Sequence, residues 1–272
     1  MVDGYTPRSL SEALSLLSSH GLTPYAGGTD LMTKGYRHEG YLFLHRIPEL
    51  RHITETRSEL RFGACCTFTE ILESKTAPAI LKEAVSRIAS PSIRNLGTIG
   101  GNIANGSDKA DSAFIFFVTD SSVRIASCRG ERTVPIKDLY LGRNKLALER
   151  DELIVEVIMP KRWLGNYRYE KIGARKSLAI SLVLFAGLMS IEDGKIAHCA
   201  TSYGVDSGVI VRRSDIDEIM IGLTVEEARA AKDSYIKAYD GAISPGRGRV
   251  SAEYSKVVCM NLLADFLSSM GI

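Results

Sequence analysis

The stretch of sequence from Arg94 to Asp111 reads RNLGTIGGNIANGSDKAD and holds four glycines and three asparagines. This composition is unfavourable for the interior of a helix and too polar for a buried strand. Glycine allows a positive φ and a close approach of a ligand to the backbone, and successive exposed N–H groups form a concave nest for phosphate oxygens. Thr98, Asn102 and Ser107 have short side chains that can bind a ligand or cap a following helix. Alone, the stretch fits a phosphate-binding loop and a long surface loop equally well.

A second, shorter glycine turn lies upstream, where Tyr25 to Leu31 reads YAGGTDL. Two such turns in one domain can bind opposite sides of one diphosphate. Neither turn contains the Gly-Lys-Ser/Thr triplet of a Walker A loop, and neither has the G-x-G-x-x-G spacing of the Rossmann fold. The two turns therefore indicate a dinucleotide site of another kind.

A helix is expected directly after this first turn, through Leu31, Met32 and Tyr36. Thr29 or Asp30 is its candidate N-cap. The N-terminus of such a helix would point free N–H groups and the positive end of its dipole at a phosphate. Because two anions repel each other, capping or a hydrogen bond to a ribose or ribityl hydroxyl suits Asp30 better than a phosphate contact.

The segments Ala26–Leu31 and Ile93–Ala104 resemble the two FAD-diphosphate segments of the flavoprotein subunit of the molybdenum hydroxylases. That family includes the medium subunits of carbon monoxide dehydrogenase and bacterial xanthine dehydrogenase. The resemblance continues through Tyr169–Arg175 and Ser251–Tyr254, so it covers essentially the whole chain. It implies an α+β fold in which a vanillyl-alcohol-oxidase-type (PCMH) FAD-binding domain, residues 1–162, precedes a smaller α+β domain of the CO dehydrogenase flavoprotein C-terminal type, residues 163–272.

The resemblance also implies the function of an FAD-binding electron-transfer subunit. A small partner subunit would carry two [2Fe–2S] clusters, and a large one would carry molybdopterin and hydroxylate the substrate. Electrons would pass from the clusters through FAD to an acceptor such as NAD, a quinone or oxygen. The flavin performs the chemistry, so no catalytic residue is expected in this chain. Two alternatives stay open: a stand-alone flavin oxidoreductase of the same fold, and a non-catalytic scaffold that has lost FAD.

FAD contacts are implied from both glycine segments and from four positions outside them. The implied FAD-binding residues are Tyr25, Ala26, Gly27, Gly28, Thr29, Asp30, Leu31, Ile88, Gly97, Thr98, Ile99, Gly100, Gly101, Asn102, Asp111, Ile154 and Lys171.

Three of these residues have a second interpretation. Asp111 either hydrogen-bonds the FAD or, like Ser112, is a candidate N-cap of a helix over residues 113–118. In the resemblance Ile88 lies near the isoalloxazine ring, but an ordinary core isoleucine fits the position as well. Lys171 either stabilises negative charge near the reduced flavin or is a surface charge.

Hydrophobic and polar periodicity predicts the remaining elements. Helices are expected at residues 9–17, 68–73, 78–89, 224–239 and 252–269. Strands are expected at residues 24–26, 41–44, 52–54, 60–63, 123–127, 131–136, 153–159, 167–172, 178–191 and 195–203, with another near Val209.

The composition of the 272-residue chain, 45% hydrophobic and 24% charged, is that of a globular protein. A net charge of +2 gives no reason to expect nucleic acid or an anionic membrane as a partner. No apolar run is long enough to span a bilayer, and the N-terminus lacks the pattern of a signal peptide, so we expect a cytoplasmic protein. The five cysteines and five histidines show no spacing typical of a disulfide framework, an iron–sulfur cluster or a metal site.

Three further segments stand out from this background. The adjacent thiols Cys65 and Cys66 are expected to be buried, since free cysteine packs as a small hydrophobe. The sequences of the polar stretches Asn105–Lys109 and Gly204–Gly208 differ from those common in the family. The basic loop Ser244–Arg249 is either solvated or reaches a partner subunit.

Overall fold

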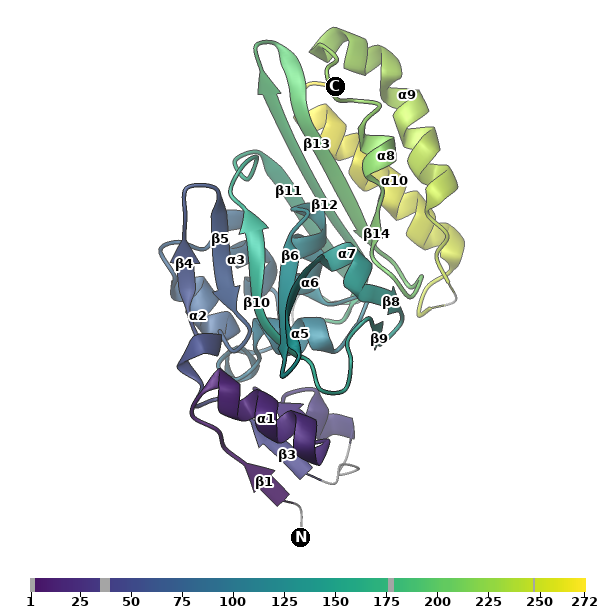
Figure 1. The fold of residues 1–272 in the computed structure, drawn as a ribbon. Coiled ribbons are helices and arrows are strands. Elements are labelled where there is room, and N and C mark those ends of the chain that lie inside the picture. Colours follow the sequence, from purple (N-terminus) through teal and green to yellow (C-terminus); the bar gives the residue numbers. More distant parts are fainter. Residues whose placement is uncertain (1–2, 35–39, 176–178, 247) are drawn as a thin grey trace.

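The computed structural model describes residues 3–34, 40–175, 179–246 and 248–272. Its strands form a small parallel sheet, two larger antiparallel sheets and a two-stranded ribbon. Figure 1 shows the small sheet at one end of the molecule, near the N-terminus, and the C-terminal helices at the other end. Helices and strands are mixed without a repeating β-α-β pattern, which confirms the predicted α+β class. No helix in the described ranges is long and apolar enough to cross a membrane.

The small sheet carries the first glycine turn at the end of one of its strands. Helix α1 (Leu10–His20) packs on it, beginning at Ser9, whose hydroxyl accepts a hydrogen bond from Glu12 N, and ending at Gly21 with φ 60°. Ala13, Leu14 and Leu17 form the buried stripe that the periodicity predicted. The strand order is β1 (Asp3–Tyr5), β3 (Gly40–Phe43) and β2 (Thr23–Tyr25), all parallel.

The central sheet has five antiparallel strands, and strands expected at residues 52–54, 60–63, 123–127, 131–136 and 153–159 form it. Helices α2 (Phe68–Glu73) and α3 (Ala79–Ser86) pack against the core of this sheet. The strand order is β4 (Ile53–Glu55), β5 (Glu59–Gly63), β10 (Leu153–Pro160), β6 (Ser122–Ser127) and β7 (Gly130–Pro135). Short connecting elements are η1 (Leu31–Lys34), η2 (Pro48–Leu50), α4 (Pro91–Arg94), α7 (Ile136–Leu139), β8 (Tyr140–Gly142) and β9 (Lys145–Leu146).

A buried carboxylate ties three strands of this sheet together. Glu156 on β10 is 3% exposed and accepts hydrogen bonds from Arg124 Nε at 2.8 Å and Arg61 Nη1 at 3.1 Å. A third contact, of 2.8 Å, joins it to His52 Nε2. Burial alone would raise the pKa of Glu156, but these partners hold it below its ordinary value.

A lowered pKa in the folded state makes this carboxylate a source of acid sensitivity. Its contribution is fully present above its unfolded pKa and is lost as the pH falls through the folded value. We expect Glu156→Gln to lower the free energy of unfolding at pH 7 by about 2 kcal/mol, the scale of charge-assisted hydrogen bonds. Urea unfolding between pH 3 and pH 7 should show the difference from wild type shrinking as the pH falls. A difference independent of pH would contradict this assignment.

The glycine-rich stretch contains a helix, contrary to the prediction from its composition. Helix α5 (Ile99–Ala104) begins at Thr98, whose hydroxyl accepts a hydrogen bond from Gly101 N at 3.1 Å. A Cβ atom added at Gly100 would lie 2.6 Å from the Ala64 Cβ. Glycine therefore lets this helix pack directly on the segment that follows β5, and tertiary packing overrides intrinsic propensity.

Helix α6 (Asp111–Val118) is buried along its whole length between the two larger sheets. Phe116 packs against Phe62 of β5, and Phe114 packs against Tyr169 of β11 (Tyr167–Gly173). Ala110 is the N-cap, so the prediction of Asp111 or Ser112 in that position was wrong. Both residues lie in the first turn, because partners on other elements bind their side chains: β11 binds Asp111, and Asn102 Oδ1 accepts a hydrogen bond from the Ser112 hydroxyl at 2.6 Å.

The C-terminal part is a four-stranded antiparallel sheet with helices on one face (Figure 1). Thr224 and Glu227 form a capping box at the start of α9. The start of the predicted strand at residue 178 lies outside the described residues. The strands after β11 are β12 (Ser181–Glu192), β13 (Lys195–Gly204) and β14 (Val211–Arg212), and the helices are α8 (Ser214–Asp217), α9 (Val225–Ala242) and α10 (Ala252–Ser269).

Candidate functional site

The two glycine segments are in direct backbone contact. A Cβ atom added at Gly27 would lie 1.8 Å from the carbonyl oxygen of Leu96, so only glycine permits this approach. Gly28 has a φ of 68°, in the left-handed region, and a Cβ atom there would lie 2.1 Å from the Tyr25 hydroxyl oxygen. The glycines that the sequence singled out therefore allow two chain segments to meet.

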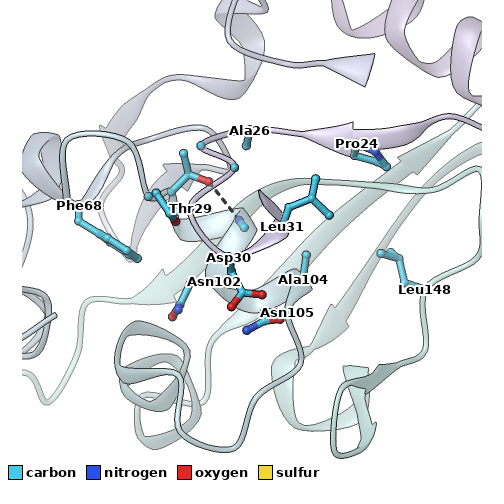
Figure 2. Close-up of a pocket in the computed structure, with 15 residues that line it drawn as sticks. Pro24, Ala26, Thr29, Asp30, Leu31, Phe68, Asn102, Ala104, Asn105 and Leu148 are labelled. Atoms are coloured by element: carbon cyan, nitrogen blue, oxygen red, sulfur yellow. Dashed lines mark hydrogen bonds between the residues drawn. The ribbon is translucent and has the colours of Figure 1, made fainter. Parts of the chain in front are cut away.

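A cavity of about 360 Å³ opens where the segments meet. Figure 2 shows residues of the first turn on one side and residues of α5 on the other, with the Asp30 carboxylate pointing toward Asn105. Ten of the implied FAD-binding residues line it, and five lining residues were not predicted. The lining consists of Pro24, Ala26, Gly27, Gly28, Thr29, Asp30, Leu31, Phe68, Gly97, Thr98, Gly101, Asn102, Ala104, Asn105 and Leu148.

Backbone N–H groups are distributed unequally between the two walls of this cavity. Within the part of the chain that the structure describes, no acceptor contacts the N–H groups of Gly27, Gly28 or Thr29. In α5, by contrast, Gly100 N donates to Ala64 O at 2.8 Å and Gly101 N to the Thr98 hydroxyl. The first turn is thus the nest with free donors, and the longer segment forms the opposite wall.

The element after the first turn begins as a 3₁₀ turn, where a helix was predicted. Its described part is the single 3₁₀ turn η1, in which Thr33 N donates to Asp30 O at 3.1 Å. Tyr36, which the prediction included in a helix, lies outside the described residues. One 3₁₀ turn has a weak dipole, so the free N–H groups of the turn itself are the main attraction for an anion here.

A second cavity of about 100 Å³ adjoins the first and shares Ala26 and Gly101 with it. Gly100 and Ile154 line this smaller space, so Ile154 lies beside the second glycine segment. Cys65 lines it too. Cys65 and Cys66 are 7% and 2% exposed, which confirms their predicted burial. Burial raises the pKa of Cys65 to about 12, so this thiol remains protonated at neutral pH.

The other implied residues lie outside the lining of both cavities. Tyr25 lies beneath the first turn, with its ring centroid 5.0 Å from that of Phe43. Ile99 is fully buried and Ile88 is 9% exposed, and both belong to the central core. These positions support the walls of the site, whereas the residues named above line it.

Asp111 and Lys171 form a buried ion pair, with Lys171 Nζ 2.8 Å from Asp111 Oδ2. The Lys171 side chain is 8% exposed, so its interpretation as a surface charge was wrong. Lys171 also donates to the carbonyl oxygen of Arg87 at 3.0 Å, and the Tyr169 hydroxyl donates to Asp111 Oδ1 at 3.0 Å. Burial raises the pKa of Asp111. The Lys171 charge and the hydrogen bonds that Lys171 and Tyr169 donate to the Asp111 carboxylate oppose this effect. The pair ties α6 to β11 beside the turn that carries Ile88.

Sequence reasoning missed five lining residues: Pro24, Phe68, Ala104, Asn105 and Leu148. Pro24 and Asn105 directly flank the glycine segments, so adjacency was a usable signal for them. Phe68 lies within the capping box formed by Thr67 and Glu70, and a Cβ atom on Gly97 would lie 2.8 Å from its ring. Leu148 lies in the connection between β9 and β10 and has no local signal, because only the tertiary fold brings it to the cavity.

Comparison with known proteins identifies the family. Residues 1–162 match the family described as FAD binding domain in molybdopterin dehydrogenase, and residues 168–270 match the CO dehydrogenase flavoprotein C-terminal domain. The xanthine dehydrogenase FAD-binding subunit of Escherichia coli O157:H7 is 33% identical over 217 residues, covering 75% of this chain and 74% of that protein. The nicotinate dehydrogenase FAD-subunit of Eubacterium barkeri is 30% identical and covers 98% and 96%.

Solved structures agree with these sequence matches. A chain of the reconstituted CO dehydrogenase from Oligotropha carboxidovorans has a TM-score of 0.89 at 26% identity, with 97% of this chain and 96% of that chain covered. The fold is thus that of a two-part flavoprotein. The chain belongs to the family of FAD-binding, or medium, subunits of the molybdenum hydroxylases. These matches confirm the predicted cofactor, FAD, and the predicted pairing of an FAD-binding domain with a C-terminal flavoprotein domain.

Proposed function

We propose that this chain is the electron-transfer flavoprotein subunit of a molybdenum-containing hydroxylase or dehydrogenase. The observation that carries the proposal is the contact between the two glycine segments at one cavity, where the N–H groups of Gly27, Gly28 and Thr29 have no acceptor among the described residues. Residues 1–162 act as the FAD-binding domain and residues 163–272 as the smaller second domain. The proposed FAD contacts are the residues named from the sequence that line the two cavities, with Asn105 and Leu148 added. The other positions named from the sequence, Tyr25, Ile88, Ile99, Asp111 and Lys171, are proposed to support this site.

The residues present fit a bound FAD. Three free N–H groups at a positive-φ glycine suit diphosphate oxygens, and the adjoining apolar cavity can exclude water from the cofactor. The Asp30 carboxylate repels phosphate but can accept a hydrogen bond from a ribose or ribityl hydroxyl. When bound, FAD would accept electrons one at a time from one-electron carriers and could pass them on singly or as a pair. The chain itself binds, orients and shields the cofactor, and we propose that the Lys171 charge, paired with Asp111, acts on the flavin as the resemblance implies.

The partners follow from the family. The proposed electron donor is a small subunit with two [2Fe–2S] clusters, which receives its electrons from a large molybdopterin subunit. NAD, a quinone or oxygen is the proposed acceptor. Relatives are medium chains by name, such as the carbon monoxide dehydrogenase medium chain of Hydrogenophaga pseudoflava. We propose the cytoplasm as the compartment, where the free thiols of Cys65 and Cys66 remain reduced.

The electron-transfer role can be tested in the assembled complex. The three subunits are co-expressed, purified and mixed anaerobically with sub-stoichiometric dithionite while cluster and flavin absorbance are followed separately. We expect the clusters to reoxidise as the flavin bleaches, and the flavin to recover when an acceptor is added. A flavin that is reduced no faster than free FAD would support a stand-alone or non-catalytic role. A complex without flavin would favour the scaffold alternative.

A further inference from the structure

The loop after α5 is fastened to the C-terminal part of the chain. This loop, Asn105–Lys109, contains Asp108, which is 3% exposed and accepts a hydrogen bond at Oδ2 from Gly208 N at 2.8 Å. At the end of β13, a Cβ atom on Gly204 would lie 3.0 Å from the Asp108 carbonyl oxygen. The two polar stretches whose sequences differ from those common in the family, Asn105–Lys109 and Gly204–Gly208, therefore contact each other.

Asp206 is the centre of this connection. Its carboxylate pairs with Lys109 Nζ at 3.1 Å and with the guanidinium of Arg143, between β8 and β9. Its backbone carbonyl accepts a hydrogen bond from Gly246 N at 2.8 Å. A Cβ atom on Gly246 would lie 2.3 Å from that carbonyl oxygen, and one on Gly248 would lie 2.2 Å from Asp206 Oδ2. Two glycines of the basic loop 244–249 thus pack on Asp206, while Ser244 and Arg249 of the same loop are exposed.

These charges are shielded enough to interact strongly. The Asp206 and Lys109 side chains are 18% and 17% exposed. Burial would raise the pKa of Asp206, but Lys109 and Arg143 lower it below its ordinary value, so the carboxylate is ionised at neutral pH. Salt screens a partly buried ion pair of this kind less than it screens an exposed pair.

The same loop reaches the cavity. Asn105 lines the cavity and ends α5, with its N–H donating to Gly101 O at 3.1 Å. Gly106 turns the chain with a φ of 65°, and its carbonyl oxygen accepts a hydrogen bond from Asn144 N at 2.9 Å. Figure 1 shows β8 and β9, which flank Asn144, beside the loops of the C-terminal part. A displacement of Lys109 or Asp108 would therefore move Asn105 and the end of α5.

We propose that Asp206 and Lys109 are positioning residues for the cofactor: through this ion pair the C-terminal part holds the loop Asn105–Lys109 in place and raises the affinity of the cavity for FAD. The inference rests on the proposed FAD site. It means that the C-terminal part of the chain increases the affinity for FAD through residues that do not line the cavity.

The test is an FAD titration of the full chain after removal of flavin, followed by the quenching of flavin fluorescence. Lys109→Met keeps the aliphatic stem and removes the charge, and we expect it to raise the Kd for FAD roughly fivefold, a typical coupling between sites. Lys109→Arg should restore nearly wild-type affinity. Asp206→Asn also removes the pair with Arg143 and should weaken binding at least as much. The double variant should bind no more weakly than Asp206→Asn alone, because that change already breaks the pair with Lys109. Asp215→Asn, which removes an exposed ion pair with Arg213, is the matched control.

A second measurement separates positioning from mere stabilisation. The Tm of each flavin-free variant is compared with its Kd, and the affinity loss should appear in variants whose Tm matches that of the control. Wild-type Kd values in Lys109→Met and Asp206→Asn would overturn the inference and leave the FAD site intact. Additive losses in the double variant would also contradict it. If the wild-type chain itself did not bind FAD, the proposed function would fail first.

Discussion

Gly27→Ala abolishes FAD binding while the chain still folds: this is the largest effect that the structure predicts. The new Cβ atom would lie 1.8 Å from Leu96 O and 2.6 Å from Leu96 C, both backbone atoms that cannot rotate away. The two glycine segments must separate, and the nest then loses its opposite wall. We expect the Kd for FAD to rise at least a hundredfold, which corresponds to about 2.7 kcal/mol of binding free energy.

The measurement is an FAD titration combined with far-ultraviolet circular dichroism. Gly241→Ala is the matched control, because a Cβ atom on Gly241 of α9 meets nothing within 4 Å. That variant should bind FAD normally and gain slightly in stability, since alanine is favoured over glycine in a helix. Normal flavin content in Gly27→Ala would show that the contact between the segments is not needed for binding.

Lys171→Met destabilises the fold strongly, because it leaves the Asp111 carboxylate buried without its counter-charge. The two side chains are 8% and 10% exposed, and removing one partner of a buried pair typically costs about 3–5 kcal/mol. We expect urea unfolding of Lys171→Met to show a loss of this size. FAD retention should fall as well, because Lys171 also donates to Arg87 O and so ties β11 to the turn that carries Ile88.

Adding Asp111→Asn to this variant distinguishes the pair from a lost packing contact. The amide is neutral and can still accept the hydrogen bond from the Tyr169 hydroxyl, so the double variant should recover much of the lost stability. Equal instability in the single and double variants would mean that the Lys171 stem, rather than its charge, supports the fold. Lys232→Met, at a half-exposed lysine of α9 that bonds Ile272 O, offers a lysine control outside this pair.

The sequence located the site because its strongest signals are local. Two glycine turns, a capping box at Thr224 and Glu227, and alternating strands are each decided by neighbouring residues. The glycine-rich composition of both segments also explains why the sequence located the two walls of the cavity and ten of the residues that line it. The helical periodicity of α10 (Ala252–Ser269) gave its bounds without help from the fold.

The errors arose where distant segments decide the structure. Helix α5 forms despite its glycines because Gly100 packs on Ala64, a contact that no local pattern contains. Asp111 has the right type for an N-cap, but β11 supplies a lysine and a tyrosine that bind it more strongly. Leu148 reaches the cavity only through tertiary folding. The link between Asp206 and Lys109 joins segments from opposite parts of the chain and was equally invisible.

The central claim, that the paired glycine segments form an FAD site, is tested most directly by one titration. The purified chain is stripped of flavin, mixed with FAD, passed through a gel-filtration column and scanned across the visible region. The account predicts a retained flavin spectrum in the wild-type chain and in Gly241→Ala, without iron–sulfur absorbance, and a colourless Gly27→Ala. A wild-type chain that emerges colourless from the column, alone and when co-expressed with its partner subunits, would contradict the account.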